Sequence, residues 1–87
     1  MNREELKRKL DELGVSDKEY SLYGSLEPDR IVLYQNYSKW EVFYFSERGS
    51  REDYQFFFSE ELACQYIYET IRHSLQVLKN INDSMNH

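Results

Sequence analysis

Residues 39–58, KWEVFYFSERGSREDYQFFF, constrain the fold of this chain more than any other segment. The segment is typical of two aromatic strands joined by a charged turn that contains a glycine. Because successive side chains of a strand point to opposite faces, Trp40 falls on one face while Phe43 and Phe45 fall on the other. A small sheet cannot easily bury rings on both faces with its own chain. The segment therefore predicts either a second covering layer or a binding partner.

The length and aromatic content of the chain predict a single, tightly packed domain. Its 87 residues are fewer than most domains contain and leave no room for a second core. Eight Tyr, five Phe and one Trp supply large side chains, each of which removes roughly 150–250 Å² from water when buried. We expect one domain over residues 1–80 and a frayed tail over residues 81–87.

The chain is acidic, with 16 Asp and Glu against 11 Lys and Arg and a formal net charge of −5. Direct nucleic-acid binding needs a basic surface that displaces counterions, so the composition argues against it. An acidic surface is also repelled by anionic membranes, and no apolar run approaches the ~20 residues that span a bilayer. The charge favours a protein partner with a basic surface.

Cysteine usage and the first segment predict a cytoplasmic protein. Cys64 is the only cysteine, so no intrachain disulfide framework is expected. The opening residues, MNREELKRKL, are rich in charge and lack the apolar region of a secretory signal. We therefore expect the chain to work in a reducing cytoplasm.

Hydrophobic periodicity predicts a short amphipathic helix over residues 2–13. Leu6, Leu10 and Leu13 share one face of it, and the remaining positions are mostly charged. Asn2 can cap the start, and Gly14 can end the helix as the first residue beyond it. So short a helix is marginal alone, and we expect its leucines to dock on the sheet.

Strands are predicted by β-branched and aromatic content between turn residues. The expected strands cover residues 31–35, 39–46 and 54–58, with a brief edge strand at 20–23. A short connection at 36–38 and a polar loop at 47–53 suit hairpins between consecutive strands. The sheet is therefore expected to be an antiparallel meander of three or four strands.

A long second helix of about 20 residues is predicted after Ser59, whose side chain can cap it. The positions expected to face the core are Ala63, Ile67, Ile71, Ser74 and Leu78, flanked by Cys64 and Leu75. The polar residues 80–87 are expected to fray. The simplest architecture is an α+β two-layer sandwich with both helices on one face of the sheet.

The residues that usually carry catalysis are too scattered to predict an enzyme. Cys64 and His73 would be the Cys–His pair, but nine residues along one helix place them on opposite sides. No set of His and Cys has zinc-ligand spacing, and no glycine pattern fits a phosphate loop. Carboxylates at Glu47, Glu52 and Asp53 could hold a cation, but a solvated charged loop is the favoured reading. We expect no cofactor and no metal.

The aromatic strands allow two readings. In one, the rings fill the core on one face and are half-covered by loops on the other. In the second, exposed rings act as interface anchors, with arginines beside them as frequent hot spots. The acidic residues spread through the loops could likewise serve solubility, or could imitate phosphates and enter a basic cleft.

Residues 39–49, with their Trp-Glu-Val-Phe-Tyr core and Ser-Glu-Arg-Gly ending, resemble small immunity proteins of bacterial polymorphic toxin systems, of the contact-dependent inhibition or LXG type. The run Phe-Ser-Glu-Glu-Leu-Ala-Cys at 58–64 is similar to a second landmark of that family, as is the charged first helix leading to residues 20–24. The resemblance covers residues 3–75 in order and spacing. It departs at Phe45, where a second tyrosine is expected, so that the ring is kept and a hydroxyl is lost.

The resemblance implies a cytoplasmic protein that binds a cognate toxin domain and neutralises it, with a nuclease as one toxin class that an acidic surface would suit. We expect Glu47, Arg48 and Asp53 to provide charge complementarity, and Tyr37 and Phe43 to act as desolvated anchors. An acidic adaptor, or a nucleic-acid mimic in a regulatory complex, is the alternative function. An exposed aromatic face would also allow a homodimer.

Overall fold

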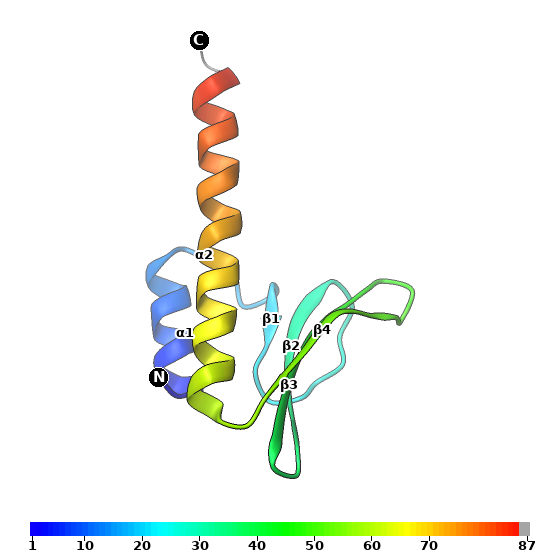
Figure 1. The fold of residues 1–87 in the computed structure, drawn as a ribbon. Helices are drawn as coiled ribbons and strands as arrows, with labels where there is room; N and C mark the ends of the chain where they lie inside the picture. The colour runs from blue at the N-terminus through cyan, green and yellow to red at the C-terminus, as the bar shows by residue number, and fades with distance from the viewer. Residues whose placement is uncertain (86–87) are drawn as a thin grey trace.

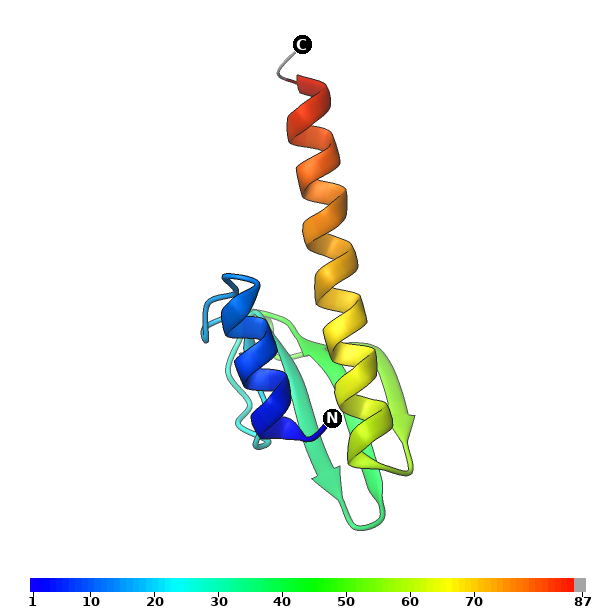
Figure 2. The same ribbon diagram turned by 90° about the vertical axis from the view of Figure 1, so that its left-hand side faces the viewer.

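The computed structural model describes residues 1–85, and it describes side chains as far as Leu78. The chain forms helix α1 (Arg3–Glu12), strands β1 (Tyr20–Ser21), β2 (Arg30–Asn36), β3 (Lys39–Phe45) and β4 (Arg51–Phe57), and helix α2 (Glu60–Met85). Both helices pack on one face of the sheet (Figures 1 and 2). The predicted two-layer α+β architecture is confirmed.

Both helix starts are capped as the sequence predicted. The Asn2 side chain accepts a hydrogen bond from the Glu5 N–H at 2.8 Å, and the Ser59 hydroxyl accepts one from the Leu62 N–H at 3.2 Å. These bonds satisfy N–H groups that have no partner within the helix. An ion pair between Arg3 and Glu60, at 2.9 Å, then joins the first turns of α1 and α2.

The core lies between the helices and the sheet. Leu6 and Leu10 of α1 are fully buried in one cluster with Leu33 of β2 and Val42 of β3. Helix α2 contributes Ala63, Cys64, Ile67 and Ile71. Burying each leucine in this way contributes roughly 1.5–3 kcal/mol, which explains why so short a helix as α1 stays folded on the sheet.

The sheet has the order β1-β2-β3-β4, and only part of it is the predicted meander. Strands β2, β3 and β4 are antiparallel neighbours, but β1 pairs with β2 in parallel. The expectation of a purely antiparallel sheet is therefore wrong. A parallel pair cannot be joined by a tight hairpin, so residues 22–29 must cross one face of the sheet to reach the start of β2.

This crossing segment covers part of the face opposite the helices (Figure 1). Val32 and Phe43 point to that face, since their neighbours Leu33 and Val42 point to the helices, yet both are almost completely buried. Gly24 lies against the Tyr34 ring on the same face. The surplus rings of the sequence are thus covered in part by the chain itself.

A β-bulge interrupts the pairing of β3 with β4. Tyr44 pairs with Glu52 and Val42 with Gln55, so Asp53 and Tyr54 together face Phe43. Asp53 takes a positive φ of 55°, a conformation that Asp adopts more readily than most residues. A bulge of this kind bends the strand and redirects a side chain.

Helix α2 is longer than predicted and continues to Met85, so residues 81–85 of the expected frayed tail are helical; residues 86–87 lie outside the described part. Its second half extends beyond the sheet (Figures 1 and 2). The expectation that Ser74 and Leu78 face the core is wrong: both are exposed, Leu78 by 57%. The helical stripe continues beyond Ile71, the last position of α2 that is buried among the described side chains.

Candidate functional site

Four exposed rings lie on the face of the sheet opposite the helices, and one of them, Tyr34, borders Gly24 of the crossing segment. We call them the aromatic face; its members are Tyr34, Tyr54, Phe56 and Phe58. Cross-strand pairing aligns Tyr34 of β2, Glu41 of β3 and Phe56 of β4 in one row. Side chains in such a row are direct neighbours, so the strands themselves assemble this surface.

The outer rings of the aromatic face hold one another in place. Phe56 and Phe58 pack edge to face, with centroids 5.6 Å apart and an interplanar angle of 86°. The Lys39 ammonium lies 4.9 Å from the Phe56 centroid. Phe58 is nevertheless 71% exposed and Phe56 46% exposed. Two adjacent phenylalanines with this much apolar surface in water are typical of a contact surface.

A buried carboxylate lies at the centre of the aromatic face. Glu41 is only 8% exposed, and the Tyr54 hydroxyl donates a hydrogen bond to its Oε1. This bond to the carboxylate raises the pKa of Tyr54 above its ordinary value. The Tyr54 hydroxyl is therefore oriented before any partner arrives, and its oxygen is left to accept a hydrogen bond.

The two ring anchors predicted from the sequence differ in their exposure to solvent. Tyr37 is 95% exposed at the tip of the β2–β3 hairpin, where its φ of 57° turns the chain. Phe43, in contrast, is 1% exposed, with the Arg51 guanidinium 4.7 Å from its ring centroid. The expectation of an exposed Phe43 anchor does not hold, because the crossing segment and Arg51 occupy the face to which the ring points.

The predicted charged residues do not gather with Tyr37. Glu47 and Arg48 are exposed in the β3–β4 turn, at the opposite end of β3 from the β2–β3 hairpin. A hydrogen bond between the Ser46 and Ser50 side chains, at 2.6 Å, closes that turn. The five residues proposed from the sequence therefore form no single site.

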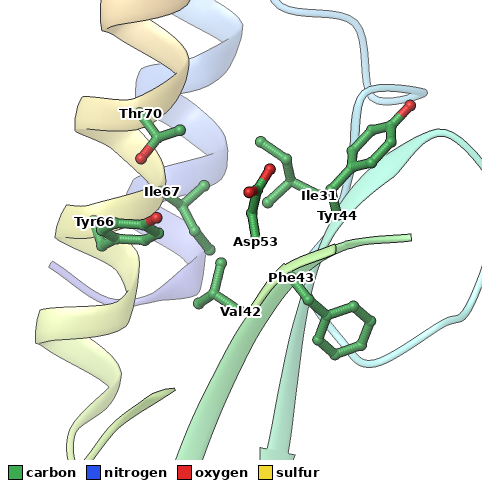
Figure 3. A pocket seen from close by; sticks show the side chains of 8 residues that line it. All are labelled: Ile31, Val42, Phe43, Tyr44, Asp53, Tyr66, Ile67 and Thr70. Carbon is green, nitrogen blue, oxygen red and sulfur yellow. The ribbon is translucent and has the colours of Figure 1, made fainter. Parts of the chain in front are cut away.

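Asp53, the last of them, lies at a pocket between the sheet and α2 (Figure 3). The pocket has a volume of about 150 Å³. Its lining residues are Ile31, Val42, Phe43, Tyr44, Asp53, Tyr66, Ile67 and Thr70. In Figure 3 the Asp53 carboxylate points between Ile31 and Ile67, whereas the Phe43 ring points away from the pocket. The walls are thus mainly apolar, with one carboxylate among them.

Further carboxylates lie beside the Tyr44 side of this pocket. The Tyr44 hydroxyl donates a hydrogen bond to Asp29 at 2.9 Å. That bond is the main cause of a raised Tyr44 pKa, and burial and the negative charges of Asp29, Glu52 and Glu19 add to it. The pocket therefore opens into a negative electrostatic environment.

The side chains considered for catalysis remain apart. Cys64 is fully buried, and burial raises the pKa of its thiol to about 11, so the thiolate is strongly disfavoured. His73 is exposed on α2, nine residues further on. In the part of the chain that the structure describes, no group of three or more His, Cys, Asp or Glu side chains is placed to hold a metal ion.

Sequence reasoning missed Tyr54, Phe56 and Phe58 as a contact surface. Their spacing of two residues places all three on one face of a strand, a signal that was present in the sequence. That face could be identified as the exposed one only after the helices and residues 22–29 had been placed.

Comparison with known proteins found no match for this chain among family models, curated proteins or solved structures. Within residues 1–85, no helix combines the length and the apolar character that crossing a membrane requires.

Proposed function

We propose that this chain is a cytoplasmic immunity protein that binds a cognate toxin domain in a stoichiometric complex and blocks its activity. The observation that carries the proposal is the aromatic face, where Phe56 and Phe58 expose their rings around the oriented Tyr54 hydroxyl. Exposed aromatic residues with a polar group among them are characteristic of protein-binding hot spots. The acidic net charge of −5 favours encounter with a basic partner.

The sequence resemblance supplies the class of partner. Residues 39–49 and 58–64 carry the two motifs similar to immunity proteins, and both flank the aromatic face. The first contains Glu41, and the second begins with Phe58. A toxin domain bound to the aromatic face would therefore contact residues of both motifs.

The proposal is tested with the product of the gene next to the one that encodes this chain. We expect the two proteins to co-purify in equal amounts and the toxicity of the neighbour to be lost on co-expression. Replacing Phe56 and Phe58 together by Ala should weaken the complex by at least ~2 kcal/mol, measured by titration calorimetry, because central aromatic anchors dominate binding energy.

Tyr23→Ala is the matched control for this double substitution. Tyr23 is 69% exposed, close to the 71% of Phe58, but it packs against Arg3 of α1 instead of joining the aromatic face. We expect this variant to bind like the wild type. Equal losses in both variants would show that the aromatic face is not the contact surface, and a neighbour that neither binds nor is inhibited would contradict the proposed function.

An acidic adaptor or nucleic-acid mimic is the alternative function, and the carboxylates of Glu19, Asp29 and Glu52 around Tyr44 favour it. Such a mimic would compete with nucleic acid for a basic protein. A DNA oligonucleotide should then displace this chain from its partner, and replacing Phe56 and Phe58 by Ala should not change that displacement. This result would support the alternative over the immunity role.

A further inference from the structure

We propose that the pocket beside Asp53 receives a lysine or arginine side chain presented by the protein partner. The inference deepens the proposed function, on which the identity of that partner rests. It names a second contact, on the opposite side of the sheet from the aromatic face.

The pocket walls fit an aliphatic chain. Ile31, Val42 and Ile67 supply most of the lining between the sheet and α2, and the volume of about 150 Å³ matches that of a cavity able to hold a benzene-sized group. The stems of Lys and Arg are of this kind, since they bury methylene groups along apolar surface while the charged end finds a polar partner.

The charge at the pocket fits a cation. The Asp53 carboxylate points into the pocket, and within residues 1–78 it takes part in no ion pair or hydrogen bond. The nearby arginines are engaged elsewhere: Arg30 pairs with Glu27 at 2.6 Å, and Arg51 lies over the Phe43 ring. The negative groups beside Tyr44 add to the attraction for a cation.

The β-bulge explains why the carboxylate is there. In a regular pairing, one residue of β4 would face Phe43, and it would point away from α2. The additional residue lets Tyr54 take that position and bond Glu41, while Asp53, with its positive φ, turns toward the pocket (Figure 3). Bulges are common next to functional sites because they redirect a side chain in this way.

The test uses small molecules that imitate the two side chains. Butylammonium and butylguanidinium are titrated into ¹⁵N-labelled protein, with butanol as the uncharged probe of the same chain length. We expect both cations to shift the amide signals of Asp53, Ile67 and Thr70 with a saturating curve, and the stronger of the two to identify the preferred side chain. Butanol should bind at least about threefold more weakly, because it lacks the ion pair.

Asp53→Asn is the matched variant, because Asn also tolerates the positive φ and only the charge is lost. It should weaken cation binding about threefold or more and leave butanol unaffected. Glu47→Gln changes the net charge equally, in the β3–β4 turn, and should have no effect. Equal binding of butanol and the cations, or unchanged cation binding in Asp53→Asn, would overturn the proposal.

The same variant separates this inference from the proposed function. If Asp53→Asn binds the neighbouring toxin as tightly as the wild type while the Phe56 and Phe58 double variant does not, the immunity role stands and the partner does not use the pocket. If the neighbour does not bind at all, the proposed function fails, and the cation titration still decides whether the pocket takes a basic side chain.

Discussion

At the scale of the residue, the surroundings of a side chain decide its role more than its type does. Phe43 and Phe56 are both phenylalanines on the same face of the sheet, yet Phe43 is 1% exposed and Phe56 is 46% exposed. The Arg51 guanidinium lies over the first ring, whereas the second ring contacts Phe58 and Lys39. Asp53 and Glu41 differ in the same way, since Tyr54 bonds the Glu41 carboxylate and leaves that of Asp53 without a partner among the described side chains.

Cys64 allows a prediction at this scale. Its pKa is raised by burial from 9.0 to about 11, so at neutral pH the folded protein should hold about a hundredth of the thiolate of the unfolded chain. We expect iodoacetamide to alkylate the native protein at least about 100-fold more slowly than the protein in urea, measured by mass spectrometry. Rapid alkylation under native conditions would contradict the burial of this thiol.

The same shift gives a pH dependence with a definite sign. The unfolded thiol loses its proton near pH 9.0 and the folded thiol near pH 11, so the stability linked to Cys64 is complete below pH 9.0 and is lost as the pH rises toward 11. Urea midpoints measured across this range should fall less steeply for Cys64→Ala than for the wild type. Parallel curves would show that the thiol is not involved.

At the scale of the element, residues 22–29 form a partial third layer on the face of the sheet opposite the helices (Figure 1). They connect the parallel strands β1 and β2 and, in crossing, place Gly24 against the Tyr34 ring. Gly24 makes this close approach possible because its φ is +83° and a Cβ there would lie 3.1 Å from the Tyr34 ring. Only glycine combines that backbone conformation with so little space.

Gly24→Ala should therefore destabilise the protein. The left-handed conformation alone costs an L-residue about 1–2 kcal/mol, and displacement of the Tyr34 ring adds to that. Gly49→Ala is the matched control, because Gly49 has nearly the same φ of +84° but nothing within 4 Å of the added Cβ. We expect the larger loss of unfolding free energy, measured in urea, for Gly24→Ala. Equal losses would show that the contact with Tyr34 has no energetic weight.

At the scale of the molecule, the body and the end of α2 differ in how the fold supports them. The extents of 50, 30 and 19 Å describe an elongated shape, and the long axis follows α2 (Figure 2). Among the described side chains, the last buried one in this helix is Ile71, at 8% exposure. Beyond it Leu75, Val77 and Leu78 are exposed.

Truncation should reveal this division. A chain that ends after Leu78 keeps every buried side chain of the described core, so its unfolding free energy should change by less than about 1 kcal/mol. A chain that ends after Thr70 also loses Ile71 and should be less stable by about 2–5 kcal/mol. Thermal and urea denaturation of both chains test this. A large loss on the first truncation would mean that the end of α2 supports the body.

Much of the fold follows from local features of the sequence. The capping residues Asn2 and Ser59 predict the two helix starts, and the leucine spacing in α1 identifies Leu6 and Leu10 as core residues. The three longer strands follow from their aromatic and β-branched residues. The candidate site was harder to predict from the sequence. Tyr37, Glu47 and Arg48 are exposed as expected, but Phe43 is not.

By itself, the sequence determined which segments are helix and strand and which helix faces are apolar, because these depend on residues a few positions apart. Only the tertiary structure decided how β1 pairs, which rings residues 22–29 cover, and where Asp53 points. Those outcomes depend on contacts between segments distant in the chain, and local periodicity carries no information about them. The difference between an aromatic core and an aromatic binding surface is therefore a property of the assembled sheet.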